Sequence, residues 1–127
     1  MNKKVYHALR IVLGLIIISS GAGVLFNLMP MPEFSSVPAN EFMESFEETG
    51  YFLPFLSIVK IACGIALLSN RFVQLALVIF IPVSINMMMF HIFLDMKSIM
   101  GALMIFTLNV ALLFANLKDY RSILKVK

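Results

Sequence analysis

The chain has 127 residues, of which 61% are hydrophobic and 13% are charged. Soluble domains carry about 45–50% apolar and about 25% charged residues, so this composition excludes an ordinary water-soluble domain and a disordered chain. The length admits one domain, which we expect to cover residues 1–127. The composition therefore indicates an integral membrane protein, whose apolar residues gather in runs of about 18 or more.

Four apolar runs follow one another along the chain, each about 19–22 residues long and able to cross a hydrocarbon layer of about 30 Å as a helix. A helix is required because lipid offers no partner to unpaired backbone groups. Two of the connections are short, which places neighbouring helices antiparallel. We therefore predict an all-α fold, an integral membrane bundle of four transmembrane helices. Their expected ranges are 8–29, 51–69, 72–93 and 98–117.

Basic residues are unevenly divided between the two ends of these helices, and this division sets the orientation of a membrane protein. With the N-terminus inside, eight of the 10 basic residues lie on the cytoplasmic side and six of the 7 acidic residues lie outside. We therefore expect a multi-pass protein with both termini in the cytoplasm. Arg10, near the start of the first helix, is expected to snorkel to the lipid headgroups.

The single long connection spans residues 30–50 and opens with two prolines, which block a regular helix there. Glutamates then alternate with apolar residues at helical spacing, and Gly50 is a suitable helix stop. We predict a short amphipathic helix on the outer surface, between helices one and two, with its apolar face down. It either covers the mouth of the bundle or serves as a lid or docking surface. Its apolar positions are Ala39, Phe42, Met43 and Phe46.

Lys60 is the most costly polar residue of the four runs, because it lies near the middle of the second one. A lysine there costs about 2.5–3.5 kcal/mol. Ser57 and Gly64 share its helix face, so this face is expected to pack against another helix. No acidic residue lies in any predicted helix to pair with it. We expect Lys60 to hold an acidic or carbonyl-bearing ligand; the alternative is a structural lysine bonded to asparagines and helix carbonyls.

Each of the other three predicted helices carries an asparagine. Asn27 lies in the outer part of the first, Asn109 lies near the middle of the fourth, and Asn86 lies one turn beyond Pro82 in the third. The proline removes one backbone hydrogen bond and predicts a kink. Together with Lys60, these amides can point toward one interior volume. They form either a polar-walled cavity open to the outer leaflet or interhelical hydrogen bonds alone.

His91, near the outer end of the third helix, either bonds a carbonyl or handles a ligand or a proton. A haem held by two histidines is excluded because His7 lies a membrane thickness away. One cysteine and two histidines do not supply the three or four ligands of a zinc site. Catalytic triads and phosphate-binding glycine loops are absent, and so is a basic patch with interleaved aromatics. We therefore expect no catalytic residue, no metal, no intrinsic cofactor and no nucleic-acid partner.

Several short segments, in their order and spacing, resemble the DoxX family of small four-helix membrane proteins. The resemblance covers roughly residues 8–117 and implies a bundle in the bacterial inner membrane. Some members look like subunits of membrane oxidoreductases that pass electrons to quinone. The matching segments are 49–54, 64–72, 82–86 and 90–94, with 10–15 and 20–21 in the first helix.

One position departs from the family. Lys60 stands where many relatives carry an acidic residue, and this reversed charge weakens the transfer of any proton or quinone role to it. Asn86 and His91 do match the family pattern.

These observations predict an accessory membrane protein that binds a small amphipathic ligand, quinone-like or lipid-like, in the bundle. We do not expect it to be an enzyme by itself. Two alternatives stay open: a quinone-interacting subunit of an oxidoreductase complex, which needs a redox partner protein, and a purely structural scaffold. The lipid bilayer is the expected surrounding, and a homo-oligomer also stays open. The predicted ligand-binding residues are Lys60, Asn86, His91, Asn27 and Asn109.

Overall fold

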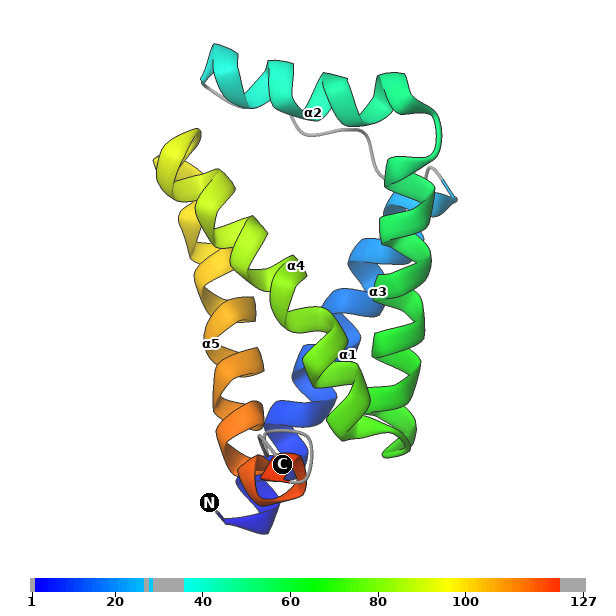
Figure 1. The fold of residues 1–127 in the computed structure, drawn as a ribbon, viewed down its shortest axis with the longest axis vertical. Helices are drawn as coiled ribbons and strands as arrows, with labels where there is room; N and C mark the ends of the chain where they lie inside the picture. The colour runs from blue at the N-terminus through cyan, green and yellow to red at the C-terminus, as the bar shows by residue number, and fades with distance from the viewer. Residues whose placement is uncertain (1, 27, 29–35, 122–127) are drawn as a thin grey trace.

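The computed structural model describes residues 2–26, 28 and 36–121 (Figure 1). Over these residues every regular element is a helix, which confirms the all-α prediction. The short helix expected in the long connection is present as α2. The α-helices are α1 (Lys3–Leu25), α2 (Val37–Thr49), α3 (Phe52–Ser69), α4 (Val73–Phe93) and α5 (Ile99–Ala115), and the 3-10 helices are η1 (Met96–Ser98) and η2 (Leu117–Tyr120).

Three helices of the described chain, α1, α3 and α4, are long and apolar enough to cross a membrane. The fourth apolar helix, α5, has 17 residues. At 1.5 Å per residue, 17 residues span about 26 Å, slightly less than a hydrocarbon layer of about 30 Å. Length and composition therefore make this a helical membrane protein.

The helix ends follow from local hydrogen bonding. α1 begins earlier than the expected residue 8 because the side-chain oxygen of Asn2 accepts a hydrogen bond of 2.9 Å from the backbone N–H of Lys4. α2 ends at Gly50, whose φ of 75° is the left-handed conformation that glycine adopts readily. Between α3 and α4 the chain reverses through Asn70 and Phe72, which both have left-handed backbones.

α1 and α3 pack closely because small residues face each other. A Cβ atom added to Gly64 of α3 would lie 2.7 Å from the Cβ atom of Ile18, and one added to Gly21 of α1 would lie 2.8 Å from the carbonyl oxygen of Ser57. Neither distance is compatible with a side chain at the present helix separation. The face predicted from Ser57, Lys60 and Gly64 therefore does meet a neighbouring helix, and that helix is α1.

α4 and α5 form a second pair, and α4 also meets α3 at the α3–α4 turn (Figure 1). From this turn α3 and α4 diverge toward the opposite end, where α2 lies across them (Figure 1). α2 contacts both helices through aromatic rings. Phe46 stacks on Phe52 of α3 with 4.3 Å between ring centroids, and Phe42 lies 5.4 Å from Phe90 of α4. The fully buried apolar core comprises Leu13, Ile17, Leu67, Leu77, Phe80 and Leu112.

Candidate functional site

Lys60 lies at the interface of α1 and α3, half-buried. Its Nζ atom donates a hydrogen bond of 3.2 Å to the hydroxyl oxygen of Ser20 on α1. A lysine ammonium carries three N–H donors. Among the described residues Ser20 is the hydrogen-bond acceptor for one of them, so the other two donors can serve a bound molecule.

Within the described chain, the four apolar helices offer Lys60 no counter-charge. None of the residues that form α1, α3, α4 and α5 is an aspartate or a glutamate. An ionised side chain inside a membrane normally pairs with an opposite charge or with backbone carbonyls. A carboxylate, a phosphate or a carbonyl oxygen brought by a ligand would supply the missing acceptor.

Asn109, in contrast, uses its side chain within the bundle. Its Oδ1 atom accepts a hydrogen bond of 2.8 Å from Ser84 of α4, and its Nδ2 atom donates one of 3.3 Å to the carbonyl oxygen of Leu77. Asn109 and Ser84 are completely buried. These contacts join α5 to α4 close to Pro82, where the backbone lacks an N–H donor.

Asn86 and His91 lie elsewhere on α4. Asn86 is exposed, on a face that it shares with Pro82 and Met89, which are also exposed. His91 lies near the end of α4, and its Nδ1 atom is 3.1 Å from the carbonyl oxygen of Asp95 and 3.8 Å from a carboxylate oxygen of the same residue. The side chain of Asp95 is buried, and its Oδ2 atom accepts no hydrogen bond within the described chain.

The predicted ligand-binding residues have different partners and different exposure in the structure. Lys60 belongs to the α1–α3 interface, Asn109 to the α4–α5 interface, Asn86 to an exposed face and His91 to the end of α4. Asn27 lies outside the described residues. Helical spacing indicates which residues share a face, but it does not indicate which neighbouring helix that face meets.

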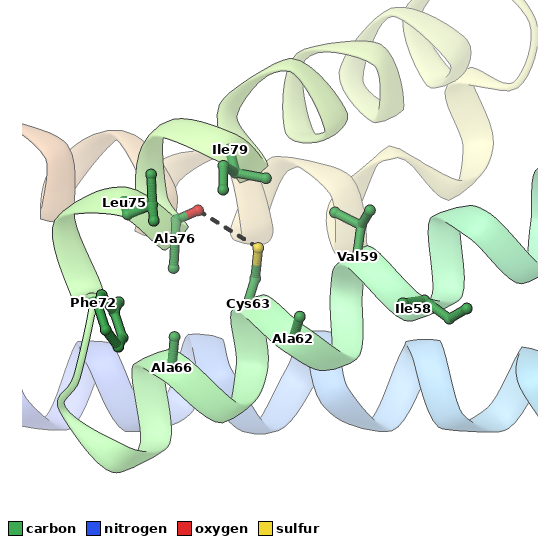
Figure 2. A pocket seen from close by; sticks show the side chains of 9 residues that line it. All are labelled: Ile58, Val59, Ala62, Cys63, Ala66, Phe72, Leu75, Ala76 and Ile79. Carbon is green, nitrogen blue, oxygen red and sulfur yellow. Dashed lines mark hydrogen bonds between the residues drawn. The ribbon is translucent and has the colours of Figure 1, made fainter.

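A groove of about 370 Å³ between α3 and α4 was not anticipated from the sequence (Figure 2). Its volume lies within the range of about 300–1,000 Å³ that is typical of small-molecule sites. Figure 2 shows the thiol of Cys63 directed at the carbonyl oxygen of Ala76, 3.7 Å away. The small residues at 62, 63, 66 and 76 are the sequence signal that points to it. The lining residues are Ile58, Val59, Ala62, Cys63, Ala66, Phe72, Leu75, Ala76 and Ile79.

Arg10 does not snorkel to the headgroups, and that expectation is wrong. The residue is 6% exposed, and its guanidinium donates hydrogen bonds to the carbonyl oxygens of Leu67 and Leu68, in the last turn of α3. Its Nη2 atom also lies 3.2 Å from Nδ1 of His7. The carbonyl groups that end a helix have no partner within it, so a neighbouring cation is stabilising there.

A polar network joins α1, α4, α5 and η2 at the same end of the protein. Nδ2 of Asn116 donates to the hydroxyl oxygen of Tyr6 at 3.0 Å, and Nε2 of Gln74 donates to Oδ1 of Asn116 at 3.4 Å. The Tyr120 hydroxyl donates a hydrogen bond of 2.8 Å to the carbonyl oxygen of Gln74. Burial, with smaller contributions from the nearby Tyr6 and Asp119, raises the pKa of Tyr120 to about 12.

Apolar helices of membrane-spanning length, packed through glycines, are the features of a small helical membrane protein. Within the described chain, no three His, Cys, Asp or Glu side chains are placed to hold a metal ion. Residues 5–94 match the sequence model of the DoxX family, and the chain belongs to this family. The resemblance drawn from its short segments is thus confirmed. Comparisons with curated proteins and with solved structures gave no match.

Proposed function

We propose that this DoxX protein is an accessory protein of the bacterial inner membrane that binds a small amphipathic ligand, quinone-like or lipid-like. The observation that carries the proposal is Lys60, a half-buried lysine at the α1–α3 interface whose hydrogen-bond acceptor in the described chain is the neutral Ser20. Because an ionisable side chain inside a membrane is energetically costly, its presence favours a role in ligand binding over a role in packing. The ligand head would therefore carry a carbonyl, carboxylate or phosphate oxygen.

The proposal includes four membrane crossings, with α5 as the fourth and α2 on the outer surface. Both termini are then cytoplasmic. Charge supports this orientation, since cytoplasmic loops are rich in lysine and arginine. The exposed glutamates of α2 lie at the end opposite to the start of α1 and to η2: Glu41, Glu44, Glu47 and Glu48. The exposed basic residues at the end with the start of α1 and η2 are Lys3, Lys4, Arg71, Lys118 and Arg121.

The other predicted residues would contribute to ligand binding to different degrees. Asn86 is the best second contact, because its amide is exposed and can both donate and accept hydrogen bonds. His91 would act at the outer end, beside Asp95. Asn109 would contribute only if a ligand displaced Ser84, and Asn27 stays a candidate from its sequence position alone.

The test is mass spectrometry of the protein extracted gently from its native membrane, for wild type, Lys60→Met and the control Lys97→Met. Lys97 is exposed and lies in η1, away from the bundle interior. Methionine keeps a similar side-chain length and removes a polar group that is costly in the membrane, so we expect Lys60→Met to fold.

We expect a stoichiometric quinone or lipid with wild type and Lys97→Met, reduced at least about tenfold in Lys60→Met, a difference of about 1.4 kcal/mol. Equal retention by all three proteins of every quinone and lipid that wild type carries would overturn the proposed role of Lys60. A redox protein retained in stoichiometric amount would instead favour the oxidoreductase-subunit alternative. A bare, folded protein in all three samples would favour the structural scaffold.

A further inference from the structure

We propose that the groove between α3 and α4 binds an anionic phospholipid, with one acyl chain in the groove and the phosphate on Arg71. This site is separate from Lys60, whose side chain reaches across the α1–α3 interface instead. The proposal depends on the membrane location of the chain and not on the ligand of Lys60.

The groove offers only hydrocarbon to its occupant. Its floor contains Cys63 and Ala76, which are each 4% exposed, and the thiol is already directed at the Ala76 carbonyl. Ile58, Leu75 and Ile79 form its rim, with exposed fractions of 58%, 56% and 46% (Figure 2). Because these side chains face outward from a membrane-spanning bundle, the groove opens toward lipid.

The dimensions of the groove fit a single hydrocarbon chain. The α3 residues that line it run from Ile58 to Ala66, about 12 Å along the helix axis. A volume of about 370 Å³ over this length is room for a slender apolar group such as an acyl chain.

A basic residue, Arg71, directly precedes the groove residue Phe72 in the sequence. Phe72 lines the groove beside the α3–α4 turn (Figure 2). The preceding residue, Arg71, is exposed. Juxtamembrane arginines and lysines attract anionic lipid headgroups. α4 begins directly after Phe72 without a side-chain cap, so its first backbone N–H groups add partial positive charge at the same place.

The end of α3 does not cancel this attraction. Its last carbonyl groups lie at the same turn and would by themselves repel a phosphate. The buried Arg10 donates to two of them, at Leu67 and Leu68, and so offsets their negative charge. Charge and shape thus favour one kind of occupant, a lipid with an apolar chain and an anionic head.

The experiment uses the full chain, delipidated in detergent and titrated with phosphatidylglycerol or phosphatidylcholine of identical acyl chains, with bound lipid counted by native mass spectrometry. Two variants probe the site: Arg71→Gln removes the charge, and Ala66→Phe fills the groove. Two matched controls leave it intact. Lys118→Gln removes an exposed charge at the same end of the protein, and Ala115→Phe adds a ring at an exposed position of α5.

We expect wild type to bind one phosphatidylglycerol more tightly than phosphatidylcholine. Arg71→Gln should weaken phosphatidylglycerol binding about fivefold and remove the preference between the two lipids, since one basic residue near a membrane surface contributes on that order. Ala66→Phe should abolish the tight binding of either lipid. Both controls and Lys60→Met should bind phosphatidylglycerol as wild type does, which separates this site from the one at Lys60.

Three results would overturn the proposal. The first is unchanged phosphatidylglycerol binding in Arg71→Gln, a variant that alters only an exposed side chain and so tests the headgroup even if Ala66→Phe does not fold. The second is an equal loss in Lys118→Gln, which would mean diffuse attraction to a basic surface. The third is a wild-type dimer that Ala66→Phe converts to a monomer without a change in bound lipid, which would make the groove a contact between two copies.

Discussion

Ser84 of α4 and Asn109 of α5 are both completely buried and are joined by a hydrogen bond of 2.8 Å. The same asparagine donates to the carbonyl oxygen of Leu77, one turn before Pro82 interrupts the hydrogen bonding of α4. Polar side chains between membrane helices are satisfied in this way by each other and by backbone groups. This contact therefore holds α4 against α5 at a point where the proline weakens α4 itself.

Replacing Asn109 by leucine is expected to lower the free energy of unfolding in detergent by about 1–2 kcal/mol, because Ser84 and the Leu77 carbonyl each lose a buried partner. Thermal unfolding followed by circular dichroism measures the effect. Thr107→Ala, at an exposed position of the same helix, is the control and should change stability little. Equal destabilisation by the two variants would contradict the role assigned to the Ser84–Asn109 contact.

Gly64→Ala is expected to separate α1 from α3, since the added Cβ atom would lie 2.7 Å from Cβ of Ile18 and 3.1 Å from the carbonyl oxygen of Gly14. Overpacking of this kind costs about 1–3 kcal/mol. Gly101→Ala is the matched control, because an added Cβ atom there has no neighbour within 4 Å in the described chain. On an exposed helix face that substitution should be neutral or slightly stabilising. An equal change in melting temperature for Gly64→Ala and Gly101→Ala would refute the close packing at Gly64.

Sequence reasoning predicts the helices well because each apolar run is long and the breaks between runs carry strong signals. Gly50 illustrates such a signal, since it is predicted to stop the helix and α2 does end there. The pairing of the helices is harder to predict. A membrane helix is apolar on its lipid-facing side as well as on its buried side, so hydrophobicity does not distinguish the two.

The surroundings of the candidate site residues are equally hard to predict from the sequence. Asn86 and Asn109 look alike in the sequence, yet Asn86 is exposed and Asn109 is completely buried. In the sequence, Arg10 resembles an arginine that extends to the lipid headgroups. In the structure it lies on α1 directly opposite the end of α3, whose backbone carbonyls accept its hydrogen bonds. The helix face around Lys60 was predictable, because small residues at helical spacing mark a close helix contact whatever the partner.

Arg10→Met is expected to destabilise the end of α3 by about 1.5–3 kcal/mol, because hydrogen bonds from a charged donor to the carbonyls of Leu67 and Leu68 are lost. Hydrogen exchange of the backbone amides around the α3–α4 turn should increase more than exchange elsewhere. Lys4→Met, which removes an exposed charge from α1, is the control. If the amides around the α3–α4 turn exchange no faster in Arg10→Met than in Lys4→Met, Arg10 does not stabilise this helix end.

Tyr120 supplies a pH-dependent contribution to stability. Burial, with additions from Tyr6 and Asp119, raises the pKa of its hydroxyl from 10.0 to about 12. The folded state therefore holds this proton more tightly than the unfolded state, so the contribution is fully present below pH 10 and is lost as the pH rises through about 12. Ionisation would also remove the hydrogen bond that the hydroxyl donates to the carbonyl of Gln74.

Comparison of wild type, Tyr120→Phe and Tyr51→Phe between pH 9 and about 12.5 tests this prediction. The chain has three tyrosines, and Tyr51 is 66% exposed, so its replacement is the control. In wild type and in Tyr51→Phe we expect a phenolate absorbance step near pH 12 and a free energy of unfolding that falls from pH 10 upward. Tyr120→Phe should lack that step and lose less stability over the same interval, because phenylalanine has no proton to release. Identical pH profiles for Tyr120→Phe and wild type would show that the hydroxyl of Tyr120 ionises equally easily in the folded and unfolded chain.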